Sequence, residues 1–285
     1  MNILKGWVVA AGLVVVPSTA LAQAAEDQTE TPTVTVSGSA AIVSDYRFRG
    51  ISQTDNPMAV QAGLTLTHES GIYGGLWASN LSQWGTYGGA NMELDLIGGY
   101  KTAISPTATI DVGLAWYMYP GGSDKTDNAE AYARLTGTTG PIQMVAGIAY
   151  SPPQEALGKW YNDGASADAG VYDRTGVKGD NLYLSGDGAL TIEGTPLTAR
   201  AHIGHSWGQD GLGPNVNATA PTGAYWDWSL GADVTWSNLT LNASWIGSDL
   251  TYRRTAYLLP AFSKGMNDGG SIAGSTVVVS LTASL

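Results

Sequence analysis

The sequence predicts an all-β protein, a transmembrane antiparallel up-and-down β-barrel of about 12 strands. Three observations lead to this fold class. Polar and apolar residues alternate with a period of two from Thr33 onward, the pattern of strands that have one apolar face. The connections between these segments are short and long in turn. The aromatic residues are 14 Tyr and 10 Trp against 2 Phe, and Tyr and Trp suit a membrane–water boundary.

The first 22 residues are a candidate secretory signal peptide. Lys5 precedes an apolar run from Trp7 to Val16, and the small residues Ala20 and Ala22 follow it, which is the order of features in an export signal. The apolar run holds about ten residues, whereas a spanning helix needs about 20, so a retained anchor is the weaker alternative. We expect a signal peptide over 1–22, a short periplasmic segment over 23–33 and the barrel over 34–285.

The composition excludes several classes of protein. The net charge is −11 at pH 7, and phosphate binding needs clustered Lys and Arg, so we expect no nucleic-acid partner. Without cysteine, the exported chain has neither disulfides nor thiolate-bound metal. The mean hydropathy of −0.03 excludes a bundle of apolar transmembrane helices. We expect no cofactor.

The alternation is clearest in the middle of the chain. In the segment 108–119, Ile110, Val112 and Leu114 share one face, while Asp111 and Gly113 share the other. Similar segments recur about a dozen times. We expect strands near 34–51, 59–68, 72–80, 91–103, 108–119, 128–137, 142–150, 180–192, 197–207, 225–236, 239–248 and 275–285.

The predicted connections fall into two classes by length. Short periplasmic turns at one end, long extracellular loops at the other and an even strand number are typical of an outer-membrane barrel. A soluble β-sandwich is the alternative, but it needs Greek-key crossovers, whereas this chain reads as successive hairpins. The tight connections are 68–71, 104–107, 138–141, 193–196 and 237–238, and the long ones include 151–179 and 247–274.

Two further patterns assign the faces of the predicted barrel. Tryptophans on the apolar phase near strand ends predict a lipid-facing girdle of Trp116, Trp226, Trp228, Trp236 and Trp245. Charges on the other phase are costly in lipid, so we expect them to line the lumen. These pore-lining candidates are Asp45, Arg47, Arg49, Glu93, Asp95, Asp111, Glu130, Arg134, Asp187, Arg200, His202, Asp227 and Asp233.

The lumen charges leave two alternatives open. They line a water-filled passage, or they form a self-neutralising network that plugs a narrow barrel. In either case the tight turn after the strand 180–192 should place Asp187 opposite Arg200 or His202. We expect Arg200 to lie between Asp187 and Asp233.

Four stretches of the sequence resemble one family. They are Ser44–Ser52 (SDYRFRGIS), Ser70–Asn80 (SGIYGGLWASN), Glu93–Tyr100 (ELDLIGGY) and Trp116–Gly121 (WYMYPG). Through them, and most closely over Val36–Asn80, the chain resembles the TorF family of porins. The resemblance implies a Gram-negative outer-membrane barrel whose transported substrate is not settled, and it supplies no catalytic residues.

Enzymatic and metal-binding readings find little support. A barrel hydrolase needs Ser or Asp beside His, and the chain has 3 His. His68 and Ser70 lie in a predicted tight turn, where a turn role is the better interpretation. His202 and His205 point to opposite faces of one strand. The loop carboxylates do not match a calcium loop and suit a solvated rim.

The leading functional hypothesis is therefore a passive diffusion channel for small hydrophilic solutes across the outer membrane, not an enzyme. The alternative is a structural or adhesive barrel with a charge-plugged lumen, whose extracellular loops carry the function. The expected partners are outer-membrane lipid and lipopolysaccharide, the barrel-assembly machinery and small hydrophilic solutes.

Overall fold

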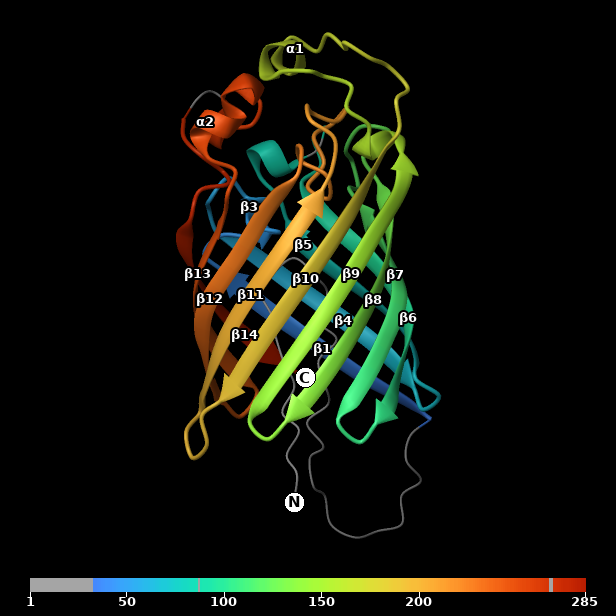
Figure 1. Cartoon of the computed structure of the whole chain (residues 1–285), viewed down its shortest axis with the longest axis vertical. Helices are drawn as coiled ribbons and strands as arrows, with labels where there is room; N and C mark the ends of the chain where they lie inside the picture. Colours follow the sequence, from blue (N-terminus) through green and yellow to red (C-terminus); the bar gives the residue numbers. More distant parts are fainter. Residues whose placement is uncertain (1–32, 87, 267–268) are drawn as a thin grey trace.

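Twelve strands close into one antiparallel barrel in the part of the chain that the structure describes (Figure 1). The structure is a computed structural model that describes residues 33–86, 88–266 and 269–285. The signal peptide expected over 1–22 lies outside these residues, as does the segment 23–32. The barrel strands are β1 (Val34–Val43), β4 (Ala59–His68), β5 (Ile72–Asn80), β6 (Met92–Ser105), β7 (Ala108–Met118), β8 (Asn128–Thr139), β9 (Ile142–Gln154), β10 (Gly179–Thr191), β11 (Leu197–Trp207), β12 (Tyr225–Trp236), β13 (Leu239–Ser248) and β14 (Thr276–Ser284).

Each strand pairs with its neighbour in sequence, and β1 closes the ring against β14. The hairpin of β12 and β13 shows how the register arises. Its turn at Ser237 takes a positive φ of 54°, and Trp236 lies opposite Leu239 and Leu230 opposite Trp245. Apolar side chains therefore meet across the hairpin, as the alternation predicts.

The two faces of the wall differ in chemistry. On β12, Leu230 is 63% exposed on the outside, whereas Asp233 is 1% exposed on the inside. On β13, Leu241 points outward and Asn242 is buried. An apolar exterior with a polar interior is the arrangement that lets a closed barrel span lipid, because closure also pairs the backbone groups of every strand.

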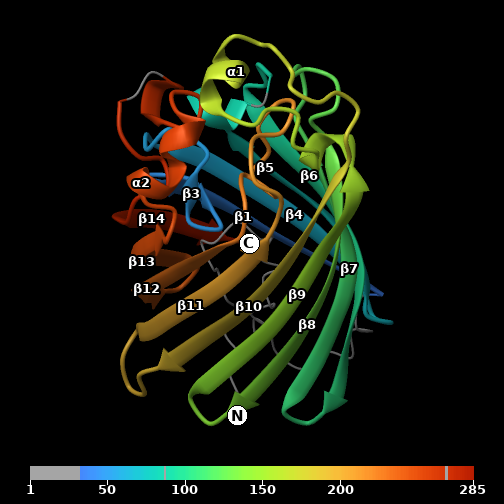
Figure 2. The ribbon, with the colours of Figure 1, turned by 45° about the horizontal axis from the view of Figure 1, so that its top comes forward.

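The connections are sorted by length between the two ends of the barrel. Figures 1 and 2 show the tight turns at one end and the long loops at the other. In the turn after β4, the backbone N–H of Ser70 donates to His68 Nδ1 at 3.1 Å, which confirms a turn role for this pair. The long loops span 44–58, 81–91, 119–127, 155–178, 208–224 and 249–275.

The expected strand over 34–51 is wrong beyond Val43. The chain leaves the wall there and forms a small hairpin of β2 (Arg47–Phe48) and β3 (Ile51–Ser52). Arg49 and Gly50 at its turn have φ values of 47° and 81°. A two-residue turn with positive φ at both positions matches the twist of a tight hairpin, so the chain reverses direction here instead of continuing as one long strand.

The long loops contain short helices. None among the described residues is both long and apolar enough to cross a membrane. Asp163 caps the first α-helix by accepting from the backbone N–H of Ser166 at 2.8 Å. The α-helices are α1 (Gly164–Asp168) and α2 (Tyr252–Thr255), and the 3-10 helices are η1 (Gln83–Thr86), η2 (Glu155–Leu157), η3 (Ala256–Leu258) and η4 (Lys264–Met266).

Candidate functional site

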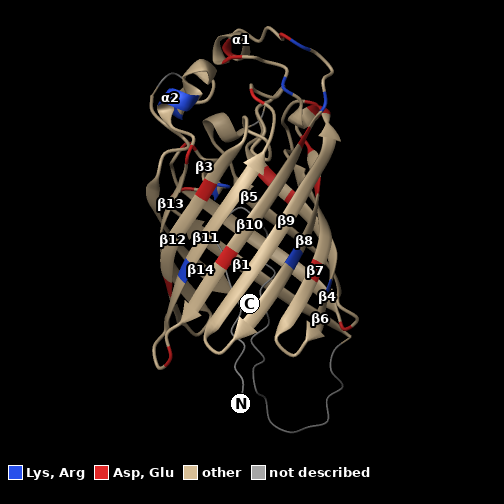
Figure 3. Ribbon diagram, in the orientation of Figure 1, with Lys and Arg blue, Asp and Glu red and all other residues tan. Residues whose placement is uncertain are grey.

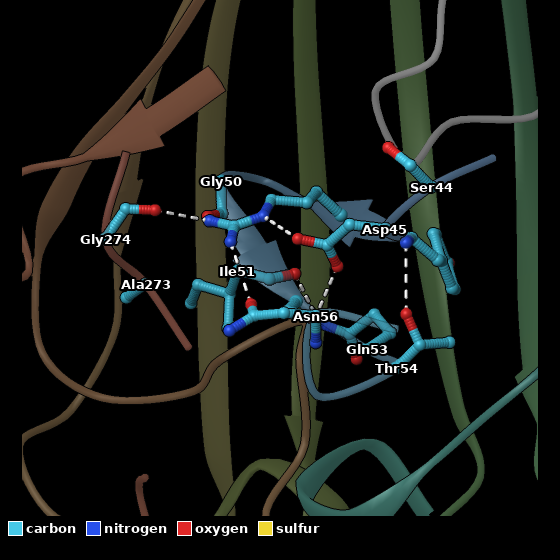
Figure 4. Close-up of polar contacts among 12 residues, drawn as sticks. Ser44, Asp45, Gly50, Ile51, Gln53, Thr54, Asn56, Ala273 and Gly274 are labelled. Carbon is cyan, nitrogen blue, oxygen red and sulfur yellow. Dashed lines mark hydrogen bonds and ion pairs between the residues drawn. The ribbon is translucent and has the colours of Figure 1, made fainter. Parts of the chain in front are cut away.

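The segment 44–58, which we call the inward segment, folds into the barrel instead of extending beyond it (Figure 4). Its apolar residues Tyr46, Phe48 and Ile51 are at most 4% exposed. The tilted ring of Tyr46 packs against Trp77 of β5 at 5.3 Å between centroids. Because its charged residues are buried as well, the inward segment is the natural centre of a candidate site.

Asp45 and Arg47 fix the shape of the inward segment. Arg47 Nε donates to Asp45 Oδ2 at 2.7 Å, and Ser52 Oγ donates to Asp45 Oδ1 at 2.6 Å. Arg47 Nη1 also donates to the carbonyls of Gly50 at 3.0 Å and Gly274 at 2.6 Å, and Figure 4 shows the second of these contacts. These two predicted residues thus fasten the inward segment to the loop 249–275.

Arg49 reaches from the inward segment across the lumen to the opposite wall. Its Nη2 donates to both carboxylate oxygens of Glu130 on β8 at 2.8 Å. The guanidinium also stacks on the ring of Tyr183 on β10, 4.0 Å from its centroid. Tyr117 and Ser151 donate to the same carboxylate, each at 3.1 Å. Both side chains of the ion pair are 1% exposed, so neighbouring side chains pack closely around this pair.

Two carboxylates on β6 lie in the interior without an arginine partner among the described residues. Glu93 accepts from the hydroxyls of Tyr46 at 2.9 Å and Tyr119 at 3.3 Å. Asp95 is 3% exposed, and its Oδ1 has no hydrogen-bond partner in the described part of the chain. Carboxyl groups therefore outnumber basic side chains at this level of the wall.

His202 joins two carboxylates on its neighbouring strands. Its Nδ1 lies 2.7 Å from Asp187 of β10, and its Nε2 lies 3.0 Å from Asp227 of β12. Arg200 forms its ion pair with Asp233. The sequence places Asp187 opposite Arg200 or His202, and His202 is the residue directly opposite. Arg200 thus lies beside Asp233, as expected. His202 is the residue that lies opposite Asp187 and contacts it.

The last two predicted lumen residues, Asp111 and Arg134, lie in the tight-turn half of the barrel, as Arg200 and Asp233 do. Asp111 Oδ1 accepts from the hydroxyl of Tyr73 at 2.6 Å, and that hydroxyl also contacts the hydroxyl of Tyr132. Arg134, directly opposite Asp111 in the register, stacks 4.6 Å from the centroid of the Tyr132 ring. This cluster adds a second polar level below the inward segment.

The full set of predicted lumen residues contains more carboxyl groups than basic groups. It combines eight carboxylates with four arginines and one histidine, carried by the inward segment and by β6, β7, β8, β10, β11 and β12. Figure 3 marks acidic and basic positions at several heights of these strands. An interior with excess carboxylate favours cations over anions along any water-filled path.

One family model matches residues 27–285, and its description is "Bacterial protein of unknown function (Gcw_chp)". The chain belongs to the Gcw_chp family. No curated protein matches it.

Solved outer-membrane channels are similar to this Gcw_chp chain at low identity. The COG4313 outer membrane channel from Pseudomonas putida F1 is 9% identical, with 92% of this chain and 99% of that chain covered and a TM-score of 0.46. The outer membrane channel DcaP of Acinetobacter baumannii is 11% identical, with 88% and 97% covered and a TM-score of 0.40. A porin structure is 9% identical, with 88% and 100% covered and a TM-score of 0.40. Nothing about function follows from likenesses at this level.

The predicted girdle tryptophans lie on the outer face of the Gcw_chp barrel. Trp116 and Trp236 are each 53% exposed. Trp226 and Trp245 are also exposed, and Trp228 is half-buried beside Trp245, with 6.0 Å between ring centroids. His205 lies on this face between Trp207 and Trp226, at 4.1 and 4.4 Å between centroids.

The tyrosines that complete the interior network were not among the predicted site residues. Tyr73, Tyr117, Tyr132 and Tyr183 each donate to, or contact, a buried charged side chain. They occupy the same phase of their strands as the charges, so the alternation itself could have identified them. Arg49 also donates to the carbonyl of Thr219 at 3.4 Å. The alternation could not have predicted this contact, because Thr219 lies in a long loop.

Lys159, a buried amine at the loop end, was not among the predicted site residues either. Its side chain lies in the loop 155–178, is 0% exposed and donates to the carbonyl of Ala220 in the loop 208–224. Burial lowers the pKa of the Lys159 amine to about 7, while nearby Asp210 opposes the shift. The loops at this end are therefore packed against one another.

Proposed function

We propose that this protein is an outer-membrane channel through which small hydrophilic solutes diffuse passively, narrowed by the inward segment. The observation that carries the proposal is the charge that half of the wall, from β6 to β12, directs inward at several levels. Burying a charge costs free energy unless water or a partner compensates it. Inward-facing charged side chains at several levels therefore favour water within the barrel.

The inward segment sets the size limit of the proposed channel. Arg49 spans the lumen to Glu130, so solutes pass beside a rigid ion pair rather than through an open cylinder. The excess of carboxyl groups favours cationic over anionic solutes. The thirteen predicted lumen residues are the proposed lining, and the resemblance of Val36–Asn80 to TorF porins supports the same assignment.

Liposome swelling tests this proposal. Purified protein in liposomes is diluted into solutes of increasing size, from glycerol to disaccharides, and the rate of swelling is followed by light scattering. We expect rapid swelling with the smallest solutes and slow swelling with the largest. Swelling no faster than in protein-free liposomes, for every solute, would refute a diffusion channel.

The packing of the inward segment favours a second candidate, a barrel with a closed lumen that displays its loops. Arg49 and Glu130 are 1% exposed and Phe48 is 2% exposed, which describes a plug as well as a constriction. In this candidate the loops 155–178 and 249–275 carry the function, structural or adhesive. A folded, heat-modifiable barrel that never conducts would favour it over the channel.

The surroundings of the barrel follow from the same proposal. The apolar belt and its tryptophans would contact outer-membrane lipid and lipopolysaccharide. Export would use the signal peptide over 1–22, and insertion would use the barrel-assembly machinery. We propose no catalytic role, because the ring nitrogens of His202 contact Asp187, Asp227 and the Tyr183 hydroxyl within the interior network, and the Ser70 hydroxyl beside His68 lies in an exposed tight turn.

A further inference from the structure

A pocket of about 340 Å³ lies at the loop end of the barrel, between the loop 208–224 and the segment that contains α2. Figure 2 shows α2 at this end, above the strands. The volume is in the range that small-molecule sites occupy. The lumen network described above includes none of its lining residues, so the pocket requires an explanation of its own.

The pocket presents hydrogen-bonding groups of both kinds. Asp210 is exposed and makes no hydrogen bond within the described residues, so both of its oxygens are able to accept. The hydroxyls of Thr222 and Tyr257 lie 3.1 Å apart, and each can donate or accept. The pocket has no side chain at Gly223, where a Cβ would stand 2.6 Å from Asp210 Oδ1. Glycine at this position therefore admits the carboxylate.

The charges of the pocket argue against a charged ligand. Arg254 already pairs with Asp249 at 2.8 Å through Nη1 and donates to the carbonyl of Ala224 through Nη2. An anion would have to compete with Asp249 for this guanidinium and would be repelled by Asp210. A cation would be attracted by Asp210 but repelled by Arg254. A neutral ligand avoids both penalties and leaves the existing ion pair intact.

The remaining walls suit the carbon skeleton of a sugar. The buried side chain of Leu250 and the 44% exposed ring of Tyr257 are apolar surfaces beside the polar groups. A polyhydroxylated ring has C–H faces that pack on such surfaces, and its hydroxyls both donate to a carboxylate and accept from hydroxyl groups. Ligands with a single functional group would leave most of these partners unused.

We propose that this pocket binds a neutral, polyhydroxylated solute of monosaccharide size. Asp210 accepts hydrogen bonds from its hydroxyls, and Tyr257 supplies both a hydroxyl and an apolar wall. The role of the pocket in capturing a solute before it enters the lumen rests on the proposed channel function. Binding of the solute in the pocket does not depend on conduction.

Binding of D-glucose to the full-length protein in detergent or nanodiscs tests the proposal, with saturation-transfer NMR as the readout. We expect saturable binding in the millimolar range. Asp210→Ala should weaken it about tenfold, because a charge-assisted hydrogen bond is lost, and Tyr257→Phe should weaken it severalfold. Asp168→Ala removes an exposed carboxylate from α1 and, as the matched control, should leave binding unchanged.

Three results would overturn the pocket assignment: no glucose binding, glucose binding that Asp210→Ala and Tyr257→Phe leave unchanged, or binding of glycine or phosphate in preference to glucose. Liposome swelling is measured on the same preparations. A barrel that binds glucose but does not conduct would refute the channel and support the site. A conducting barrel that does not bind glucose would refute the site alone.

Discussion

Arg49 and Glu130 form the most deeply buried ion pair between the inward segment and the wall. The geometry is bidentate, with both contacts at 2.8 Å, and the stacked ring of Tyr183 adds a cation–π contact. Removing one member of a buried pair leaves the other charge without compensation, which costs about 3–5 kcal/mol, whereas replacing both members is often neutral. Because the double replacement costs less than the single one, the contribution of the Arg49–Glu130 pair can be tested without unfolding the barrel.

Arg49→Met should release the inward segment from β8. We expect a larger single-channel conductance and a lower temperature for the heat-induced gel shift, because Glu130 is left buried without its partner. The double variant Arg49→Met with Glu130→Gln should regain most of the thermal stability, since it buries no unpaired charge. If Arg49→Met conducts like the wild type, the pair does not restrict the lumen.

Lys159 gives the loop end a dependence on pH. Its pKa is lowered to about 7 in the folded protein by burial, against about 10.4 in an unfolded chain. Between these values the unfolded lysine binds a proton that the folded one does not, so packing of the loops should become more favourable as pH rises from 7 to 10. Below pH 7 both forms are protonated and the effect levels off.

Limited proteolysis of the loop 208–224 measures this effect. Cleavage of the wild type should be slower at pH 9 than at pH 7. Lys159→Met keeps the apolar stem and removes the titrating amine, so the variant should lose this pH dependence when compared with wild type under the same conditions. An equal pH response in both proteins would show that Lys159 does not control the pH dependence of the loops.

At the scale of elements, the hairpin of β12 and β13 fixes the two faces of the wall. The chain contains no cysteine, so single cysteines report cleanly. Ser229→Cys should react with a small water-soluble thiol reagent, because position 229 lies on the interior phase. Leu230→Cys, 63% exposed on the outer face as leucine, should react only with a lipid-soluble reagent. The reverse pattern would mean that the register is shifted by one residue.

Much of this element structure could be predicted from the sequence, because a period of two specifies strand, face and hairpin partner together. A two-residue turn at Ser237 places apolar residues of one strand opposite apolar residues of the next, and this requirement pairs Leu230 with Trp245. The inward segment could not be predicted in this way. Asp45, Arg47 and Arg49 alternate with aromatic residues as a strand does, whereas the contacts that hold the segment inside the barrel come from a distant loop and from β8.

For the candidate site, too, the sequence predicts which face each residue occupies but not which residues are in contact. The alternation places Asp187 and Asp227 in the interior, but it does not specify that His202 joins them. Which basic side chain contacts a given carboxylate depends on how far each side chain extends across the strands. The distances to directly opposite and to diagonal neighbours differ by only a few ångströms. The pocket with Asp210 and Tyr257 lies beyond any periodic signal, because loops whose conformation is set by packing build it.

At the scale of the whole molecule, the sorting of loops predicts the orientation of the barrel. Long loops of outer-membrane barrels face the outside of the cell, and short turns face the periplasm. A protease added to intact cells should therefore cut within 155–178 but not at the turn after His68. An epitope tag inserted in each connection reports the cleavage, and disrupted cells provide the control. Cleavage at the turn in intact cells would invert the topology.

Single-channel recording in a planar bilayer shows directly whether the lumen conducts. We expect discrete, small conductance steps and a reversal potential that shows cation preference, since carboxylates outnumber arginines in the lumen. The preference should weaken as salt rises, because ions screen such charges over about 10 Å at 0.1 M. A folded, heat-modifiable preparation that gives no steps would contradict the channel and leave the closed barrel as the account of this protein.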